Sequence, residues 1–337
     1  MERLISIDSK KITPVFQQIK DEIVRLIEER KLTQGSPIPS IHRFCTAHQL
    51  SPGTVIRAYE ELRLAGIVAS KQGKGYYIAN TTLVRKLRIF LLFDRMNAYK
   101  EILYQSIIEG LGKDVEVNVF FHHYDHKRFE QIIRDNLGKY SHYLIMPHLH
   151  EDLSRILKRI PDKELILIDG MVEGYTFEGA AVYQNFRNDI FNGLREGFPL
   201  IQKYCCVNLC LSANPFQFIP KGCIDGFMDF IKETGFDGNI IHRLAETGIV
   251  RNHFYIVFDD AELIWFLKEI ERLGWKVGVD IGVVSYDETP MKELLHGGIS
   301  VLTTDFQAMG SIAVSMIKGE LSGRMANRFE LISRGSF

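Results

Sequence analysis

The chain of 337 residues lacks any long apolar run. Its apolar stretches, such as IFLLF at residues 89–93, are far shorter than the roughly 18 residues that a transmembrane helix needs. Its first residues, MERLISIDSKK, also lack the continuous apolar segment of a secretory signal. We therefore expect a cytoplasmic protein that has no membrane as a partner.

Cysteine is scarce, and the spacing of the five cysteines does not match that of a disulfide-bonded or zinc-binding domain. Cys45 stands alone, Cys205, Cys206 and Cys210 share one apolar run, and Cys223 follows shortly after. An odd number without a CxxC pair argues against both a disulfide framework and a zinc ribbon. We expect all five to be core thiols in a reducing compartment.

Signatures of common catalytic and metal sites are also missing. The sequence contains no GxSxG elbow, no P-loop and no HExxH motif. The histidine-rich segment FHHYDH at residues 121–126 offers at most two ligands on one face of a strand end, so we interpret it as a surface cluster. We predict no catalytic residues, no metal site and no cofactor.

Charge is distributed unevenly, although the net charge is only −1. Residues 1–80 carry 12 of the 41 Lys and Arg residues but 8 of the 42 Asp and Glu residues. The remainder of the chain is therefore acidic, with 29 basic against 34 acidic side chains. This asymmetry indicates that the two parts have different partners.

Apolar residues recur at helical spacing in PVFQQIKDEIVRLIEER, with Thr13 as the expected N-cap and Pro14 at the first helical position. A second helix is predicted to begin after Ser40. Ser51 is expected to cap a third helix that ends at Gly66. The following IVASKQGKGYYI predicts two short strands around a glycine turn.

Three helices followed by a hairpin form the plan of a winged helix-turn-helix. In that plan the third helix enters the major groove and the hairpin touches the flanking DNA. The free N–H groups at the start of a helix favour phosphate, Gly53 allows close approach of the backbone, and Arg57 can reach a guanine edge or a phosphate. The alternative is a set of solvated surface residues on a small helical bundle; the ordered combination favours DNA binding.

Four motifs in this order carry a resemblance: PVFQQI, GSPIPSIHRF, SPGTVIRAYEELRLAGIV and KQGKGYYI. Together, over residues 14–78, they resemble the DNA-binding domain of the GntR family of bacterial transcription regulators. His42 stands where that family usually has a DNA-contacting arginine, and Arg43 follows one place later. The resemblance and the helix pattern imply DNA contacts by Ser40, His42, Arg43, Ser51, Gly53, Thr54, Arg57, Lys71, Gln72, Gly73 and Lys74.

After residue 80 the pattern changes to short apolar runs that alternate with helical stretches. Such alternation predicts parallel sheets covered on both faces, and the number of runs favours two doubly wound lobes. We predict a helix-turn-helix domain at 1–80, a linker at 81–87 and a two-lobed parallel α/β effector domain at 88–337. The predicted strands are 87–93, 115–121, 142–147, 164–169, 205–211, 239–241, 254–258, 281–286, 300–303 and 329–333.

Polar side chains follow the predicted strands at their carboxyl ends, where parallel sheets bind ligands. Carboxylates there accept paired sugar hydroxyls, and aromatic rings pack against the C–H side of a sugar. The alternative is that strand-end aspartates such as Asp169 and Asp259 only cap the helices that follow. The candidate positions are Asp94, Asn97, Tyr99, Lys100, His148, Asp169, Arg187, Asp189, Phe227, Asp259, Asp287 and Phe306.

A second resemblance covers residues 88–337 and rests on DIGVVSYDETP, GGISVLTTDFQAMG and NRFELISRGSF. These motifs resemble the effector-binding core of the LacI family, which is related to periplasmic sugar-binding proteins. The resemblance implies effector contacts by all of the candidate positions above except Asp169, most directly Asp287, Asp259, Phe227 and Phe306. The LacI-type hinge helix is missing, so DNA reading would rest with the winged domain.

These features predict a homodimeric repressor of carbohydrate catabolism that binds operator DNA and is controlled by a sugar between the two lobes. Two alternatives remain at this point. One is an enzyme joined to a DNA-binding domain, and the other is a constitutive DNA-binding protein whose lobes only dimerise.

Overall fold

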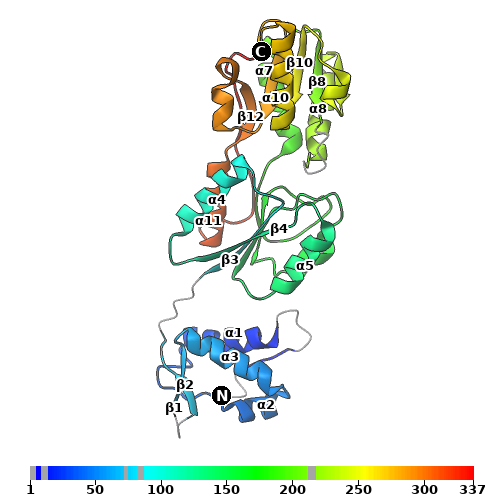
Figure 1. Ribbon diagram of the computed structural model, residues 1–337. Helices are drawn as coiled ribbons and strands as arrows, with labels where there is room; N and C mark the ends of the chain where they lie inside the picture. Colours follow the sequence, from blue (N-terminus) through cyan, green and yellow to red (C-terminus); the bar gives the residue numbers. More distant parts are fainter. Residues whose placement is uncertain (1–4, 9–13, 72–74, 82–86, 212–217) are drawn as a thin grey trace. The chain divides into compact units, whose positions relative to one another are not determined.

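The computed structural model describes residues 5–8, 14–71, 75–81, 87–211 and 218–337. The chain divides into two compact units. The smaller unit comprises Met1–Ile89 with Asp114–Glu116 and Ile133–Ser141, and the larger comprises Phe90–Lys113, Val117–Ile132 and His142–Phe337. Figure 1 follows the elements along the sequence.

The N-terminal elements are three helices and an antiparallel hairpin: α1 (Val15–Glu28), α2 (Ile41–His48), α3 (Pro52–Leu64), β1 (Val68–Lys71) and β2 (Gly75–Ile78). This confirms the predicted order of elements. Pro14 precedes α1 instead of opening it, and Thr13 lies outside the described residues. The inward faces meet in one apolar core, where the buried Tyr59 donates a hydrogen bond of 2.9 Å to the carbonyl of Pro39.

Two six-stranded sheets follow. The first sheet has the order β13 (Arg324–Ala326), β7 (Ala180–Tyr183), β6 (Leu165–Asp169), β5 (His142–Ile145), β3 (Arg88–Phe93) and β4 (Glu116–Phe121). The second sheet has the order β14 (Phe329–Ile332), β12 (Ser300–Thr304), β11 (Gly282–Tyr286), β10 (His253–Val257), β8 (Cys206–Cys210) and β9 (Gly238–Ile241).

Helices connect and cover these strands: α4 (Ala98–Leu111), α5 (His126–Asn136), α6 (Ser154–Leu157), α7 (Phe186–Ile201), α8 (Lys221–Thr234), α9 (Leu244–Thr247), α10 (Asp260–Leu273) and α11 (Phe306–Ile317). Two short 3-10 helices, η2 (Pro290–Glu293) and η3 (Leu295–Gly297), follow β11. In the second sheet, α7 and α8 share one apolar cluster with one face, while α10 packs on the other. This arrangement confirms the doubly wound prediction for that sheet.

All ten predicted strands are present, with ends shifted by at most two residues. Two strands were missed, β7 and β13, because they are four and three residues long and contain alanine, which has weak strand propensity. One edge strand departs from the parallel direction, since β14 pairs with β12 in the antiparallel direction. An antiparallel edge strand on an otherwise parallel sheet is common in doubly wound folds.

The chain returns from the second sheet to the first through α11. This helix follows β12 yet packs against α4, the helix that follows β3, and the two lie side by side in Figure 1. Gly310 makes the close approach possible, because a Cβ at this position would come within 2.6 Å of the side chain of Ser106. Ser106 also donates a 2.8 Å hydrogen bond to the carbonyl of Gln307.

Three cysteines, Cys206, Cys210 and Cys223, are buried as expected, and Cys45 is partly buried. The prediction of a core thiol was wrong for Cys205, which is exposed. It lies just before β8, where the strand has not yet entered the sheet. All five are free thiols.

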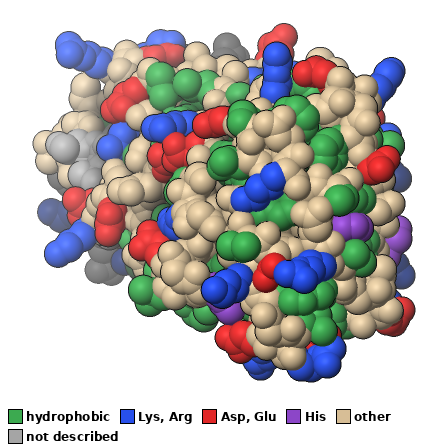
Figure 2. Space-filling model, turned by 90° about the horizontal axis from the view of Figure 1, so that it is seen from above, with side chains coloured by type: hydrophobic (Ala, Val, Ile, Leu, Met, Phe, Trp, Pro, Cys, Tyr) green, Lys and Arg blue, Asp and Glu red, His purple; other side chains and the backbone are tan. Residues whose placement is uncertain are grey.

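No helix among the described residues is both long enough and apolar enough to cross a bilayer. Figure 2 shows one face of the molecule, on which basic and acidic side chains are interspersed.

Helices α7 and α8 touch so closely that glycine is required at the contact. A Cβ at Gly226 would overlap the carbonyl oxygen of Arg187, which is backbone and cannot rotate away. We expect Gly226→Ala to lower the free energy of unfolding of the larger unit by about 1–3 kcal/mol, the usual cost of overpacking. Urea unfolding followed by circular dichroism measures it.

The control is Gly53→Ala in α3, where an added Cβ meets no atom within 4 Å. Because alanine is the better helix former, this variant should be as stable as the wild type or more stable by up to about 1 kcal/mol. Equal destabilisation by both substitutions would contradict the packing argument.

Candidate DNA interface and effector site

The N-termini of α2 and α3 form the first candidate surface. Ser40 caps α2, since its hydroxyl accepts a 3.3 Å hydrogen bond from the N–H of Arg43. Ser51 precedes α3 as predicted, but its hydroxyl pairs with the Thr54 hydroxyl at 2.8 Å instead of capping a backbone N–H. Both helices are fully described and carry no acidic residue in their first turns, so their positive ends remain suited to phosphate.

The structure leaves most of the predicted DNA-contacting side chains accessible. Thr54 is partly buried, and the exposed residues are Ser40, His42, Arg43, Ser51, Gly53, Arg57 and Lys71. Gln72, Gly73 and Lys74 at the tip of the hairpin lie outside the described residues.

Arg57 has contacts within its own domain. Its Nε lies 3.0 Å from a carboxylate oxygen of Glu61, and its guanidinium stands 3.7 Å from the ring centre of Phe16 on α1. The side chain is 55% exposed, so the guanidinium is braced against α1 while one side stays open to solvent. A braced guanidinium loses little conformational freedom when it binds a phosphate or a base.

The second candidate site is a row of buried polar side chains at the carboxyl ends of the strands. Asp94, directly after β3, is fully buried and forms an ion pair with the equally buried Lys100 of α4. The other carboxylate oxygen of Asp94 lies 3.0 Å from Nδ1 of His148, the residue that follows β5 by three positions.

The row continues into the second sheet. His148 Nε2 lies 3.4 Å from a carboxylate oxygen of Asp169 at the end of β6. The other oxygen of Asp169 accepts a 2.6 Å hydrogen bond from the Gln184 amide. The amide oxygen of Gln184 accepts a 2.9 Å hydrogen bond from the hydroxyl of Tyr286, the last residue of β11. We call these six residues, Asp94, Lys100, His148, Asp169, Gln184 and Tyr286, the polar row.

The charge states in the polar row follow from its environment. Burial opposes ionisation of Asp94, but the hydrogen bond with His148 and the charge of Lys100 outweigh it and hold the pKa of Asp94 well below its usual range. Burial also raises the pKa of Tyr286 well above its ordinary value. Its phenol therefore stays protonated and donates a hydrogen bond to the amide oxygen of Gln184. The ionised Asp94 can only accept hydrogen bonds and the protonated Tyr286 donates one, so the donors and acceptors are defined at both ends of the polar row.

Asp287 follows Tyr286 and differs from Asp94 in lacking a direct partner. Its Oδ1 atom is buried and has no hydrogen-bond partner among the described residues. Burial raises the pKa of Asp287 to about 8; Lys292 and Lys100 oppose this effect, and the negative charge of Asp169 adds to it. The backbone is strained here, with φ of 59° at Asp287 and 68° at Asp169, a conformation that residues other than glycine rarely adopt.

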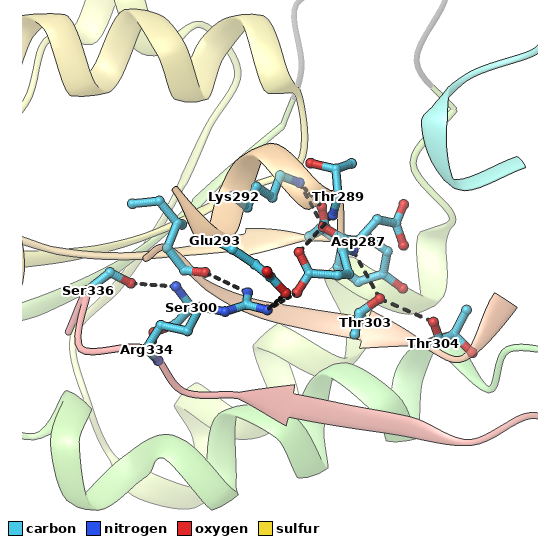
Figure 3. Close-up of polar contacts among 12 residues, drawn as sticks. Asp287, Thr289, Lys292, Glu293, Ser300, Thr303, Thr304, Arg334 and Ser336 are labelled. Atoms are coloured by element: carbon cyan, nitrogen blue, oxygen red, sulfur yellow. Dashed lines mark hydrogen bonds and ion pairs between the residues drawn. The ribbon is translucent and has the colours of Figure 1, made fainter. Parts of the chain in front are cut away.

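A polar network holds the Asp287 loop in place (Figure 3). The buried ammonium of Lys292 donates to the backbone carbonyls of Tyr286 at 2.9 Å and Asp287 at 2.7 Å, and lies 3.0 Å from a carboxylate oxygen of Asp260. Arg334 lies 2.5 Å from a carboxylate oxygen of Glu288. This support fixes a strained backbone that an isolated loop would relax.

Aromatic rings border the polar row. Tyr99 stacks on Phe306 with ring centres 4.6 Å apart, and His148 stacks on Phe218 at 5.0 Å. The structure therefore brings together predicted residues from four distant segments: Asp94, Tyr99 and Lys100, then His148, then Asp287, then Phe306.

Other predicted effector contacts have different surroundings. Arg187 is exposed and pairs with Asp229 of α8, with Nε 2.6 Å from a carboxylate oxygen. Phe227 is wholly buried in the apolar cluster beneath α8. Asp259 caps α10, with one oxygen accepting from the N–H groups of Ala261 and Glu262, as the alternative interpretation held.

Asn97 and Asp189 have intermediate surroundings. Asn97 caps α4 by accepting a 3.2 Å hydrogen bond from the N–H of Lys100. Asp189 in α7 is partly buried, and burial raises its pKa to about 6. Its Oδ2 atom has no hydrogen-bond partner among the described residues.

Sequence reasoning missed three members of the final arrangement. Gln184 follows the missed strand β7, Tyr286 lies within the motif DIGVVSYDETP but was not singled out, and Lys292 follows that motif by two residues. Asp169 stood among the strand-end candidates but not among the implied effector contacts. Its position at the end of β6 was the one signal available, because only the folded sheet places Asp169 beside His148.

The interpretation of the histidine-rich segment as a surface cluster was wrong for His122, whereas His123 is exposed and His126 is partly buried. His122 is wholly buried, its ring meets Phe129 edge-on, and burial lowers its pKa to about 4. Within the described part of the chain, no group of three or more His, Cys, Asp or Glu side chains is arranged to hold a metal ion.

A pH-dependent stability follows from Asp287. A carboxyl whose pKa is higher in the folded than in the unfolded protein destabilises the fold increasingly as pH rises from about 4 to about 8. We expect Asp287→Asn to remove this effect, so that its stability advantage grows across that window by up to about 1.4 kcal/mol for each pH unit. Urea unfolding at pH 5 and pH 8 measures it.

The exposed Asp237 provides the control, because Asp237→Asn should follow the wild type at both pH values. An equal gain from Asp287→Asn at pH 5 and pH 8 would show that Asp287 does not titrate in this window.

Known proteins match both parts of the chain. Residues 16–78 match the model of "bacterial regulatory proteins, gntR family". The HTH-type transcriptional repressor YtrA of Bacillus subtilis strain 168 is 33% identical over 117 residues, which cover 34% of this chain and 84% of that protein.

Two solved structures match the larger part of the chain in fold. A LacI family transcriptional regulator from Silicibacter pomeroyi aligns with a TM-score of 0.62 at 16% identity, covering 74% of this chain and 98% of that one. A periplasmic binding protein/LacI transcriptional regulator from Alkaliphilus metalliredigens QYMF, complexed with D-xylulofuranose, aligns with a TM-score of 0.55 at 14% identity over the same shares.

These matches agree with the winged helix-turn-helix at the N-terminus and with the two parallel sheets that follow it. The chain belongs to the GntR family of bacterial regulatory proteins, and it is a DNA-binding transcriptional regulator that carries a domain of LacI-type fold.

Proposed function

We propose that this regulator is a sugar-responsive repressor whose affinity for operator DNA is controlled by a sugar bound between the two lobes, at the polar row and Asp287. The observation that carries the proposal is the strained, supported Asp287, whose buried Oδ1 has no partner among the described residues. A ligand hydroxyl would satisfy this oxygen.

The surroundings of Asp287 support a sugar in particular. Sugars combine hydroxyls, which carboxylates accept in pairs, with an apolar C–H face that packs on aromatic rings. The Asp169 and Asp287 carboxylates supply the first kind of partner, and the stacked rings of Tyr99 and Phe306 supply the second. The D-xylulofuranose held by the Alkaliphilus protein of the same fold agrees with this ligand class.

The proposed coupling uses the hydrogen bond between Tyr286 and Gln184, which joins the second sheet to the end of β7 in the first. A sugar that contacts both lobes would stabilise one arrangement of the two, and operator affinity would change by the difference in its binding energy for the two arrangements. We further propose a winged domain at 1–80, a linker at 81–87, and a homodimer whose effector domains, 88–337, hold two winged domains at half-site spacing.

A sugar panel tests the effector proposal. The full-length protein is mixed with pentoses, hexoses and deoxyhexoses, and its melting temperature and its affinity for DNA selected from a random pool are measured. We expect one sugar to raise the melting temperature and to change DNA affinity. Asp287→Asn should lose both responses and keep sugar-free DNA binding, whereas Asp237→Asn should keep both.

Two results would overturn the sugar proposal. If no sugar changes either quantity, the lobes are constitutive dimerisation modules. If a sugar is converted to a product, the effector domain is an enzyme.

The DNA proposal is tested at Arg57. We expect Arg57→Ala to weaken DNA binding by about 1–3 kcal/mol if the guanidinium reads a base, and to reduce the salt dependence of binding if it contacts a phosphate. Fluorescence anisotropy at several salt concentrations measures both, and sugar stabilisation should be unchanged.

The matched control is Arg63→Ala, which removes the same charge nearer the end of α3, where Arg63 pairs with Glu60. Gly53→Ala adds a second test: it should preserve stability and still weaken DNA binding, because a Cβ there would stand where the duplex backbone approaches. An equal loss of affinity from Arg57→Ala and Arg63→Ala would argue against reading by the first turns of α3.

A further inference from the structure

A cavity of about 500 Å³ lies over β8, β9 and β10 on one face of the second sheet. None of its lining residues belongs to the polar row or to the Asp287 loop. It is therefore separate from the proposed sugar site, and its volume falls within the range of small-molecule pockets.

The cavity exists because the connection from β9 to β10 is short. Residues 242–252 join these strands and contain a single helical turn, α9. A crossover between parallel strands usually includes a longer helix that covers the sheet. The polar side chains of the sheet beneath this short connection line the cavity: Asn208, Asn239, His253 and Tyr255.

Hydrogen bonds fix the orientation of the first of these groups. The Asn208 Nδ2 atom donates to the carbonyl of Phe254 at 3.2 Å, and a carbonyl can only accept. The same nitrogen lies 3.3 Å from Nδ1 of His253, so that ring nitrogen accepts and the proton resides on Nε2. Burial lowers the pKa of His253, which favours this neutral form.

The other two groups are fixed in the same way. Asn239 donates through Nδ2 to Asn208 Oδ1 and to Cys206 Sγ, each at 3.2 Å, which uses both amide hydrogens and leaves its Oδ1 without a partner among the described residues. The Tyr255 hydroxyl accepts a 2.8 Å hydrogen bond from the N–H of Val250. Burial raises the pKa of Tyr255 to about 12, so the phenol retains a proton to donate.

The strands beneath the cavity thus present two donors, His253 Nε2 and the Tyr255 hydroxyl, beside the acceptor Asn239 Oδ1; His242 and Thr247 of the connection also line the cavity. Apolar side chains such as Ile240 and Val250 form much of its wall. Its charged groups at the rim, Arg243 and Glu246, lie 2.7 Å apart and neutralise each other. The complementary ligand has apolar faces, a mixed polar edge and no net charge.

We propose that this cavity is a second effector site for a neutral planar heterocycle of the nucleobase or nucleoside type. Such molecules have apolar ring faces and an edge that alternates acceptors with donors. This inference goes beyond the proposed sugar response, because it gives the regulator a second input on the opposite side of β10 from the apolar cluster beneath α7 and α8.

The test is calorimetric titration of the full-length protein with adenosine, guanosine, cytidine, uridine and the four free bases. We expect saturable one-site binding of at least one of these below millimolar concentration. His253→Phe keeps a ring and removes the donor, so it should weaken binding about tenfold, the usual effect of one lost hydrogen bond. If the wild-type protein binds a free base as well as it binds the nucleoside, the cavity recognises the base and not the ribose.

Val250→Trp tests the same cavity without touching its polar floor. Val250 lines the cavity and is 51% exposed, so tryptophan there should block ligand entry and abolish binding while the fold persists. Val279→Trp is the control, because Val279 is 70% exposed and lies outside the cavity lining. Asp287→Asn should also leave nucleoside binding intact.

Three results would overturn the proposal: no saturable binding by any base or nucleoside, binding that survives Val250→Trp, or binding lost in Asp287→Asn. The last would place the nucleoside at the polar row instead of the cavity. Because the sugar response is measured separately, failure here leaves the sugar proposal standing.

Discussion

The buried ion pair between Asp94 and Lys100 constrains the whole carboxyl edge of the first sheet. Two charges taken out of water are tolerated only when they are paired closely and their remaining hydrogen-bonding capacity is used. Lys100 supplies the pairing, and His148 takes the second oxygen of Asp94. That requirement fixes the His148 ring, which in turn lies within reach of Asp169. The rest of the polar row, Gln184 and Tyr286, then connects this edge to the second sheet. Beside this row, the buried Oδ1 atom of Asp287 has no hydrogen-bond partner among the described residues.

The two candidate surfaces of the regulator follow opposite physical rules. The residues expected to meet DNA are local in sequence and mostly exposed, because a polyanion is bound largely through accessible charges and helix N-termini. The residues expected to meet a sugar come from four distant segments and are mostly buried. A small uncharged ligand supplies little electrostatic energy of its own, so its site must exclude water and orient its groups in advance. Substitutions in either surface should therefore be separable in their effects.

In the second sheet, the short connection between β9 and β10 leaves a cavity on one face. Its face beneath α7 and α8 is filled by apolar side chains and by glycine contacts that bring helices close. On the other face, α10 covers the apolar half, but the single turn of α9 leaves the amides of Asn208 and Asn239 beside an open cavity. These amides are held in one orientation by backbone and cysteine partners. Hydrogen-bonded side chains of this kind make the floor of the cavity rigid.

The order of elements could be read from the sequence because it depends on local patterns. Helical spacing, prolines and glycines at the ends of elements, and short apolar runs predicted the winged domain and ten strands. Strands β7 and β13 were missed because three or four residues are too few to show a recognisable pattern. The exposed residues of α2 and α3 that are expected to contact DNA could be predicted for the same reason. The candidate effector site was only half visible in the sequence: Asp94, His148 and Asp287 could be identified as strand-end groups, but Arg187, Phe227 and Asp259 were equally eligible by position. Only the tertiary structure shows which of these residues lie together, because burial and the pairing of charges depend on the folded sheets, and the hydrogen bond between Gln184 and Tyr286 joins residues 102 positions apart in the chain.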